Sequence, residues 1–181
     1  AAANGSDVHT NSWGSSVAGA YTTSAMQSDY AARNHSGMLI LFAAANEGID
    51  ANSDGEIDLD SMGAPATAKN VLSVAASENN RPTITSQWGG WWPGDYPANP
   101  VNGDKMADDS EGLAAFSSRG PTDDGRLKPD VSAPGTFVLS SRSRSTAASG
   151  WGVYDSDYVY MGGTSMATPI TAGAAALLYQ H

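Results

Sequence analysis

Residues 161–169, MGGTSMATP, place a serine where its hydroxyl could act as a nucleophile. Two glycines let the backbone approach a substrate closely, and Thr164 and Ser165 then begin a helix of small residues. The first amides of a helix lack intrahelical partners and favour negative charge, so Ser165 is expected beside a ready oxyanion site. The alternative is that these hydroxyls only cap a buried helix. The pattern differs from the GxSxG elbow of α/β-hydrolases because Ala167 replaces its second glycine.

A second group of polar residues lies in the loop 50–61, DANSDGEIDLDS. Oxygen-bearing side chains alternate and are followed by Gly55 for a sharp turn, as in the first part of an EF-hand-type calcium loop. The twelfth position is Ser61 rather than Glu, so Asp58, Asp60 or a backbone carbonyl such as that of Glu56 would have to complete the shell. The alternative is a solvated acidic turn, in which the carboxylates repel one another. The predicted ligands of a structural calcium are Asp50, Asn52, Asp54, Glu56 and Asp58.

Buried strands alternating with helices are predicted to position these groups. The apolar run 38–45, MLILFAAA, is typical of a strand buried on both faces, and NVLSVAAS at 70–77 of a second one. Residues 128–140 predict a shorter extended piece. This alternation favours an α/β fold with a parallel sheet and helices on its faces.

Two helices and one long excursion complete the predicted elements. The first helix runs from about Ser24 to His35, with Ser24 and Gln27 as a capping box. The second begins at about Thr164 and is expected to be buried, with Pro169 near its first turn, where a missing N–H costs little. Residues 79–112 contain several Trp and Pro but show neither a helical nor a strand-like hydrophobic period. This pattern predicts a long excursion on the surface.

Composition narrows the classes of function. The chain has 181 residues, 40% of them hydrophobic, which suits one globular domain. Its 19 acidic residues against 9 Lys and Arg give a net charge of −10, which disfavours nucleic acid as a partner. There is no cysteine, so disulfides and thiolate metal sites are excluded. There is also no apolar run of about 18 residues, so no membrane association is expected.

Four separated stretches together resemble the subtilisin-like serine peptidases, in that family's order. They are TNSWG at 10–14, AAANEG at 43–48, FSSRGPTDDGRLKPDVSAPGT at 116–136 and GTSMATPITAG at 163–173. The stretch APATAKNVLSVAASENNRP at 64–82 is similar to the branch of oxidatively stable alkaline proteases. The resemblance implies a three-layer subtilisin-like α/β fold with a mainly parallel sheet flanked by helices. It also implies that residues 1–181 form one partial peptidase domain, lacking the N-terminal part and any second domain.

The same resemblance implies roles for individual residues. Ser165 stands at the position of the nucleophile that forms an acyl-enzyme, and Asn46 at that of the oxyanion-hole amide. Taken alone, an Asn just past a buried strand is more typical of a turn, and only the resemblance favours the oxyanion role for Asn46. The expected substrate-binding residues are Ser12, Trp13, Gly14, Ala43, Ala44, Ala45, Gly163 and Thr164. Ala45 departs from the commonest pattern, which has glycine there, so its methyl group is expected to narrow the first specificity pocket.

The histidines limit what this chain is expected to do. The family takes its catalytic Asp and His from DTG- or DSG-like and HGTH-like segments N-terminal to the SWG stretch, and neither segment is present. We expect none of His9, His35 and His181 within about 3.5 Å of the Ser165 hydroxyl, the limit of a credible hydrogen bond. The resemblance thus implies a serine endopeptidase whose base lies outside this chain, so that the 181 residues alone are inactive.

Two other interpretations stay open. The chain could be a non-catalytic peptide-binding or structural module, or one half of a split peptidase. The expected partners are polypeptide substrates and either the missing N-terminal half of the domain or a second copy of the chain. No nucleic acid, membrane, catalytic metal or organic cofactor is expected, and the family implies secretion to the extracellular space.

Overall fold

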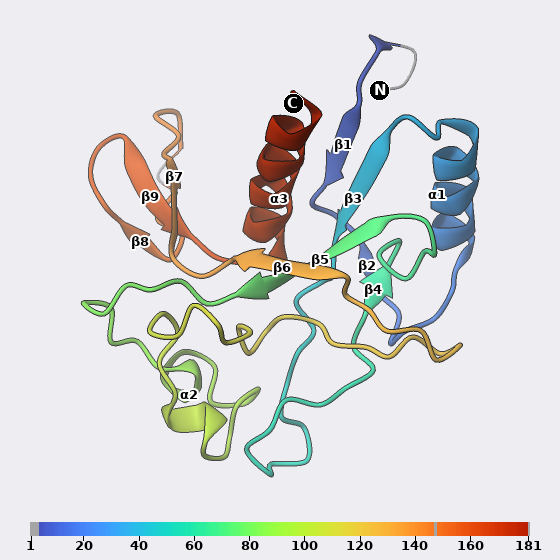
Figure 1. Cartoon of the computed structure of the whole chain (residues 1–181). Coiled ribbons are helices and arrows are strands. Elements are labelled where there is room, and N and C mark those ends of the chain that lie inside the picture. The colour runs from blue at the N-terminus through green and yellow to red at the C-terminus, as the bar shows by residue number, and fades with distance from the viewer. Residues whose placement is uncertain (1–3, 147, 181) are drawn as a thin grey trace.

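A computed structural model describes residues 4–146 and 148–180. A four-stranded parallel sheet, in the order β1-β3-β5-β6, forms its centre (Figure 1). Its strands are β1 (Val8–Asn11), β3 (Leu39–Ala43), β5 (Leu72–Ser77) and β6 (Val131–Pro134). A two-stranded sheet pairs β2 (Ser15–Ser16) with β4 (Gly63–Ala64), and an antiparallel sheet has the order β7-β9-β8. The last three strands are β7 (Val138–Ser141), β8 (Gly152–Val153) and β9 (Tyr158–Met161).

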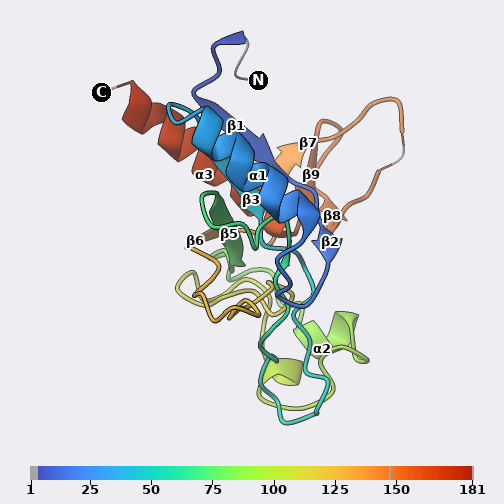
Figure 2. The ribbon, with the colours of Figure 1, turned by 90° about the vertical axis from the view of Figure 1, so that its right-hand side faces the viewer.

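Two long helices cover opposite faces of the parallel sheet: α1 (Thr23–Asn34) and α3 (Thr164–Tyr179). Successive side chains of a strand point to opposite faces. Ile40 and Phe42 therefore belong to the apolar cluster that includes Ala25 of α1, and Leu41 to the cluster that includes Ala167 of α3. Figure 1 shows α3 and α1 on either side of β1 and β3, and Figure 2 gives the view from the side of α1. The predicted α/β fold with a mainly parallel sheet is confirmed.

The start of α1 differs from the prediction. Its N-cap is Thr22, whose hydroxyl accepts a hydrogen bond from the Ala25 N–H at 3.5 Å. Ser24 lies inside the helix and does not act as its N-cap. The predicted capping box of Ser24 and Gln27 is therefore wrong. Three hydroxyl residues in a row can each cap a helix, and the packing of Ala25 against the sheet selects the first.

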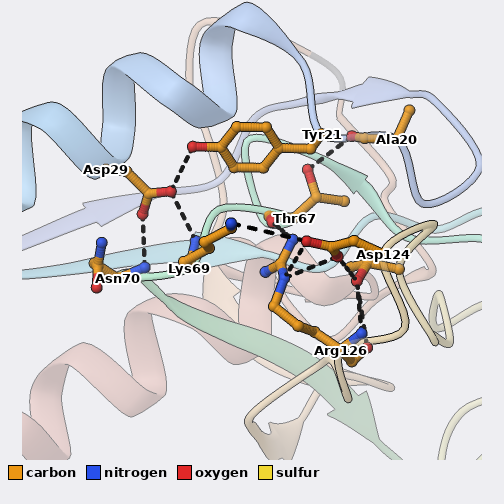
Figure 3. A network of polar contacts seen from close by, with 9 residues as sticks. Ala20, Tyr21, Asp29, Thr67, Lys69, Asn70, Asp124 and Arg126 are labelled. Atoms are coloured by element: carbon orange, nitrogen blue, oxygen red, sulfur yellow. Dashed lines mark hydrogen bonds and ion pairs between the residues drawn. The ribbon is translucent and has the colours of Figure 1, made fainter.

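A carboxylate of α1 fastens the segment that follows β4. Asp29 accepts hydrogen bonds from the Tyr21 hydroxyl at 2.7 Å and from the backbone N–H groups of Lys69 at 3.0 Å and Asn70 at 2.6 Å (Figure 3). Partial burial alone would raise the pKa of Asp29, but these hydrogen bonds outweigh it and lower the pKa. These bonds hold residues 69–70 close to α1.

The excursion at 79–112 contains only short elements, α2 (Trp88–Trp91) and the 3-10 helix η2 (Val101–Gly103). The prediction that it lies on the surface is wrong in part, because Trp88 is 0% exposed and belongs to the main core. The Trp88 indole N–H donates to Glu78 at 3.1 Å. Burial raises the pKa of the Glu78 carboxyl to about 7, although this hydrogen bond alone would lower it. An acidic side chain at the end of β5 thus anchors the excursion.

Helix α3 packs across all four parallel strands, and its buried side chains end at Ala172. Ala167 and Ala172 are buried, whereas Leu177 is 65% and Leu178 is 78% exposed. The prediction of a buried helix is therefore wrong for its last turns. Among the described residues, no helix is both long and apolar enough to cross a membrane.

Candidate active site

Ser165 is the second residue of α3, which follows β9 after two glycines. The N-cap, Gly163, has φ of 136°, a conformation that other residues rarely adopt. A Cβ atom on Gly163 would lie 3.6 Å from Asn46 Nδ2 and 3.7 Å from the Ser165 backbone nitrogen. Both nitrogens therefore lie near Gly163, which has no side chain of its own to cover them.

Asn46 follows β3 and is fixed by the first residue of α3. Its Oδ1 accepts hydrogen bonds from the Thr164 backbone N–H and from the Thr164 hydroxyl, both at 2.9 Å. Because an N–H can only donate, the oxygen of the amide faces α3 and Nδ2 is directed away from Thr164. The donor atom is thereby oriented before any ligand arrives, as an oxyanion hole requires.

The Ser165 hydroxyl lies against the segment after β1. Its Oγ donates to the Ser12 carbonyl oxygen at 3.4 Å. In the other direction, the Ser12 hydroxyl donates to the Ser165 carbonyl oxygen at 2.9 Å. Pro169 lies well inside α3, beyond the predicted first turn, and has no N–H for that carbonyl four residues earlier. Ser12 supplies the missing donor.

A cavity of about 190 Å³ opens beside Ser165. It brings together most of the predicted substrate-binding residues, which come from three separate segments. The residues that line it are Ser12, Trp13, Gly14, Ser15, Ser16, Ala43, Ala45, Asn46, Glu47, Gly63, Thr164 and Ser165. Gly163 borders a neighbouring cavity instead.

The lining of this cavity differs from the sequence-based expectation at Ala44, Gly63 and Glu47. Ala44 does not line it, because strand alternation turns its side chain into the cluster beneath α1. Ala45 does line it, with φ of 93°, a backbone conformation that favours glycine. Gly63 and Glu47 also contribute and were missed, although Glu47 follows directly after Asn46 in sequence. A larger cavity, of about 540 Å³, lies elsewhere, around Arg119.

Neither described histidine contacts Ser165. His9 lies in β1, where its Nδ1 is 3.3 Å from Asn11 Nδ2, and His35 is the exposed C-cap of α1. Within residues 4–146 and 148–180, the hydrogen bond of the Ser165 hydroxyl goes to Ser12 alone. His181 falls outside the described residues. In the described part of the chain, no imidazole therefore forms a hydrogen bond with the Ser165 hydroxyl.

The acidic loop is held together by its own hydrogen bonds. Asp50 is buried and accepts from the N–H groups of Asp54 at 2.9 Å and Gly55 at 3.1 Å. Asn52 accepts from Asp54, Asp54 from Glu56, and Asp58 from the Ala51 N–H. The donor types suit calcium. However, no three acidic or histidine side chains converge on one point in the described segments, and calcium stays a prediction.

The chain is similar to known proteins along its whole length. Residues 1–181 match the family model described as Peptidase_S8, the subtilase family. Serine protease AprX of Bacillus subtilis (strain 168) is 34% identical over 151 residues, which are 80% of this chain and 26% of AprX. Serine protease/ABC transporter B family protein tagB of Dictyostelium discoideum is 45% identical over 74 residues, which are 38% of this chain and 4% of tagB. The chain thus spans a minor part of either relative.

Solved structures support the fold. The prenylagaramide maturation protease PagA superposes with a TM-score of 0.58 at 22% identity, covering 98% of this chain and 45% of PagA. The patellamide maturation protease PatA gives the same TM-score of 0.58 at 21% identity, with 98% of this chain and 45% of PatA covered. At these identities the likeness concerns the arrangement of helices and strands.

Proposed function

Because the chain belongs to the subtilase family of serine peptidases, we propose that it is the C-terminal portion of an endopeptidase domain, with Ser165 as the nucleophile. The observation that carries this proposal is the contact of Thr164 with Asn46, which holds an amide donor beside the Ser165 N–H. Polypeptides are the substrates that the family implies.

The reaction begins when a substrate chain lies along Ser12, Trp13 and Gly14 and adds a strand to this edge. One side chain on the acyl side enters the 190 Å³ cavity. The Ser165 Oγ loses its proton to a base as it attacks the scissile carbonyl carbon. The base then gives that proton to the amine nitrogen as the C–N bond breaks, which leaves the acyl-enzyme for water to hydrolyse. Asn46 Nδ2 and the Ser165 N–H hold the negative charge that develops on the carbonyl oxygen.

The base is proposed to come from a segment outside this chain. β1 is an edge strand of the described parallel sheet, and its backbone groups on the open side can pair with another strand. The apolar side chains of Leu177, Leu178 and Tyr179 are exposed on the last turns of α3. Both features suit a further part of the same domain that carries Asp and His. A second copy of the chain is the alternative occupant of this edge.

Several further properties are proposed on the resemblance. We place the protein with the oxidatively stable alkaline proteases and outside the cell. A structural calcium in the loop after Asn46 would stiffen the oxyanion loop, with Asp50 and Asp54 among its ligands. None of the catalytic steps depends on that ion.

The test is a fusion in which the Asp- and His-bearing segment of a family member precedes Ala1. We expect the chain alone to cleave peptides negligibly and to resist phosphonate labelling. The fusion should gain both activities, and the same fusion with Ser165→Ala should lose them. A fusion that folds and binds peptide without cleavage or labelling would instead support the non-catalytic module. Cleavage by the isolated chain that depends on Ser165 would show that its base lies within these residues.

A further inference from the structure

A second cavity, of about 250 Å³, adjoins the first at Asn46. The first cavity is lined by Thr164 and Ser165, whereas the second is lined by the preceding pair, Gly162 and Gly163. On the proposed function, the acyl side of the substrate lies in the first cavity. The part that leaves after cleavage therefore extends past Asn46 towards the second.

Four of the ten residues that line this second cavity are aromatic. The aromatic lining residues are Trp92, Tyr96, Phe116 and Trp151. The ring of Trp151 lies 5.8 Å from that of Trp92 and 5.9 Å from that of Phe116, measured between centroids. It covers the backbone of Gly162, where an added Cβ would lie 2.1 Å from a ring carbon of Trp151. The wall is thus a packed unit.

Tyr96 and Asp95 are held in place by backbone contacts. The Tyr96 hydroxyl donates to the Gly48 carbonyl oxygen at 3.1 Å. Burial, and then the charge of Asp95, raises the pKa of Tyr96, so the phenol remains a donor at neutral pH. The Asp95 carbonyl oxygen accepts from the Asp50 N–H at 2.8 Å, and the Asp95 N–H donates to the Trp92 carbonyl at 3.1 Å.

The charge that lines this cavity is negative and comes from Asp95. Asp95 is exposed, and its carboxylate forms no hydrogen bond or ion pair with any residue in the described ranges. No Lys, Arg or His is among the described residues that line the cavity. A cation is attracted both to aromatic faces and to an unpaired carboxylate. A negatively charged side chain beside Asp95 would be repelled by its carboxylate.

We infer that this cavity binds the side chain of a substrate residue on the leaving-group side and prefers a basic one, Arg or Lys. Its position relative to the scissile bond rests on the proposed function, but the preference for a cation does not. The specificity-determining residues are Asp95, Trp92 and Trp151. They come from the excursion and from the segment before β8, both outside the stretches that carry the catalytic groups.

The direct test is binding of small amides to the chain itself, which needs no catalysis. Argininamide and norleucinamide both carry an α-amine, so their comparison isolates the guanidinium. We expect argininamide to bind about fivefold more tightly than norleucinamide. Calorimetry, or NMR of the indole N–H signals, measures the two dissociation constants. Asp95→Asn should reduce that ratio to about twofold or less. Glu111→Gln, a change of equal charge at an exposed site of the same excursion that does not line the cavity, should leave the ratio unchanged.

Each outcome decides the inference. Equal binding of the two amides, binding of neither, or a ratio that survives Asp95→Asn would overturn it. Trp92→Leu should weaken argininamide by about threefold through the lost ring while the norleucinamide affinity falls less. In the active fusion, a peptide with Arg after the scissile bond should be cleaved with higher kcat/KM than one with Glu. Selective binding without cleavage by the fusion would uphold the cavity and reject the peptidase proposal, and cleavage without selective binding would do the reverse.

Discussion

Ser12 and Ser165 exchange two hydrogen bonds although 153 positions separate them in the sequence. The Ser12 hydroxyl donates to the Ser165 carbonyl at 2.9 Å, and the Ser165 hydroxyl donates to the Ser12 carbonyl at 3.4 Å. The first bond fills the place of the N–H that Pro169 lacks. A proline inside α3 thereby links the segment proposed to bind substrate to the residue proposed to attack it.

This link predicts a coupling between Ser12 and Pro169. Ser12→Ala should lower the free energy of unfolding by about 1 kcal/mol, because the Ser165 carbonyl loses its donor. In a Pro169→Ala background the alanine N–H can bond that carbonyl, so the same change should cost clearly less. Urea unfolding of the four proteins measures the coupling. Strictly additive effects would mean that Ser12 does not replace the helical hydrogen bond.

Asn46 is predicted to act in catalysis rather than in substrate binding. In the active fusion, Asn46→Ala should lower kcat by about 100- to 1000-fold with little change in KM, because the donor serves the developing oxyanion. Asn34→Ala, at the exposed end of α1, is the control and should leave both constants unchanged. A loss confined to KM would remove Asn46 from the oxyanion site.

Ala45 combines a methyl group with a backbone conformation suited to glycine. Its φ of 93° is strained for alanine, so Ala45→Gly should stabilise the fold by about 1 kcal/mol after the entropic cost of glycine. The change should also widen the first cavity and speed cleavage after large acyl-side residues. Ala43→Gly, in the regular strand β3, should instead destabilise the fold. Thermal unfolding of the two variants compares them, and a destabilised Ala45→Gly would argue against strain.

Glu78 predicts a pH dependence of stability. The pKa of its carboxyl is 4.5 without burial and about 7 in the folded protein, so the folded state binds more protons between these values. The free energy of unfolding should therefore fall as pH rises from about 4.5 to about 7. Glu78→Gln should flatten this fall, whereas Glu111→Gln, at an exposed site, should not. Denaturant unfolding across the interval provides the measurement, and an unchanged slope in Glu78→Gln would exclude this carboxyl as its source.

The calcium proposal predicts a rise in melting temperature. An ion that binds only the folded protein stabilises it by mass action. Calcium should raise the melting temperature of the chain, and Asp54→Asn should weaken that effect because one carboxylate is lost. Magnesium, which favours stricter octahedral geometry, should be less effective. No calorimetric heat and no change in melting on addition of calcium would reject the site.

Local patterns in the sequence determined the longest elements, α1, β3, β5 and α3, and part of the site. The run 38–45 contains β3 because a strand buried on both faces needs continuous apolar residues. The glycines before Ser165 and the small residues after it located the start of α3 correctly. The family resemblance then brought Asn46 to the helix end, which is where the contact with Thr164 places it.

Contacts between distant segments were decided only by the tertiary structure. The choice of Thr22 as N-cap depends on how Ala25 packs, and the orientation of Ala44 on which face of β3 meets α1. The sequence shows that Pro169 lacks an N–H, but not that Ser12 compensates for it. The aromatic cavity likewise exists because the excursion folds back to place Asp95 and Trp92 beside Trp151. Periodicity and capping arise within a few residues of chain, whereas these contacts depend on packing between elements far apart in sequence.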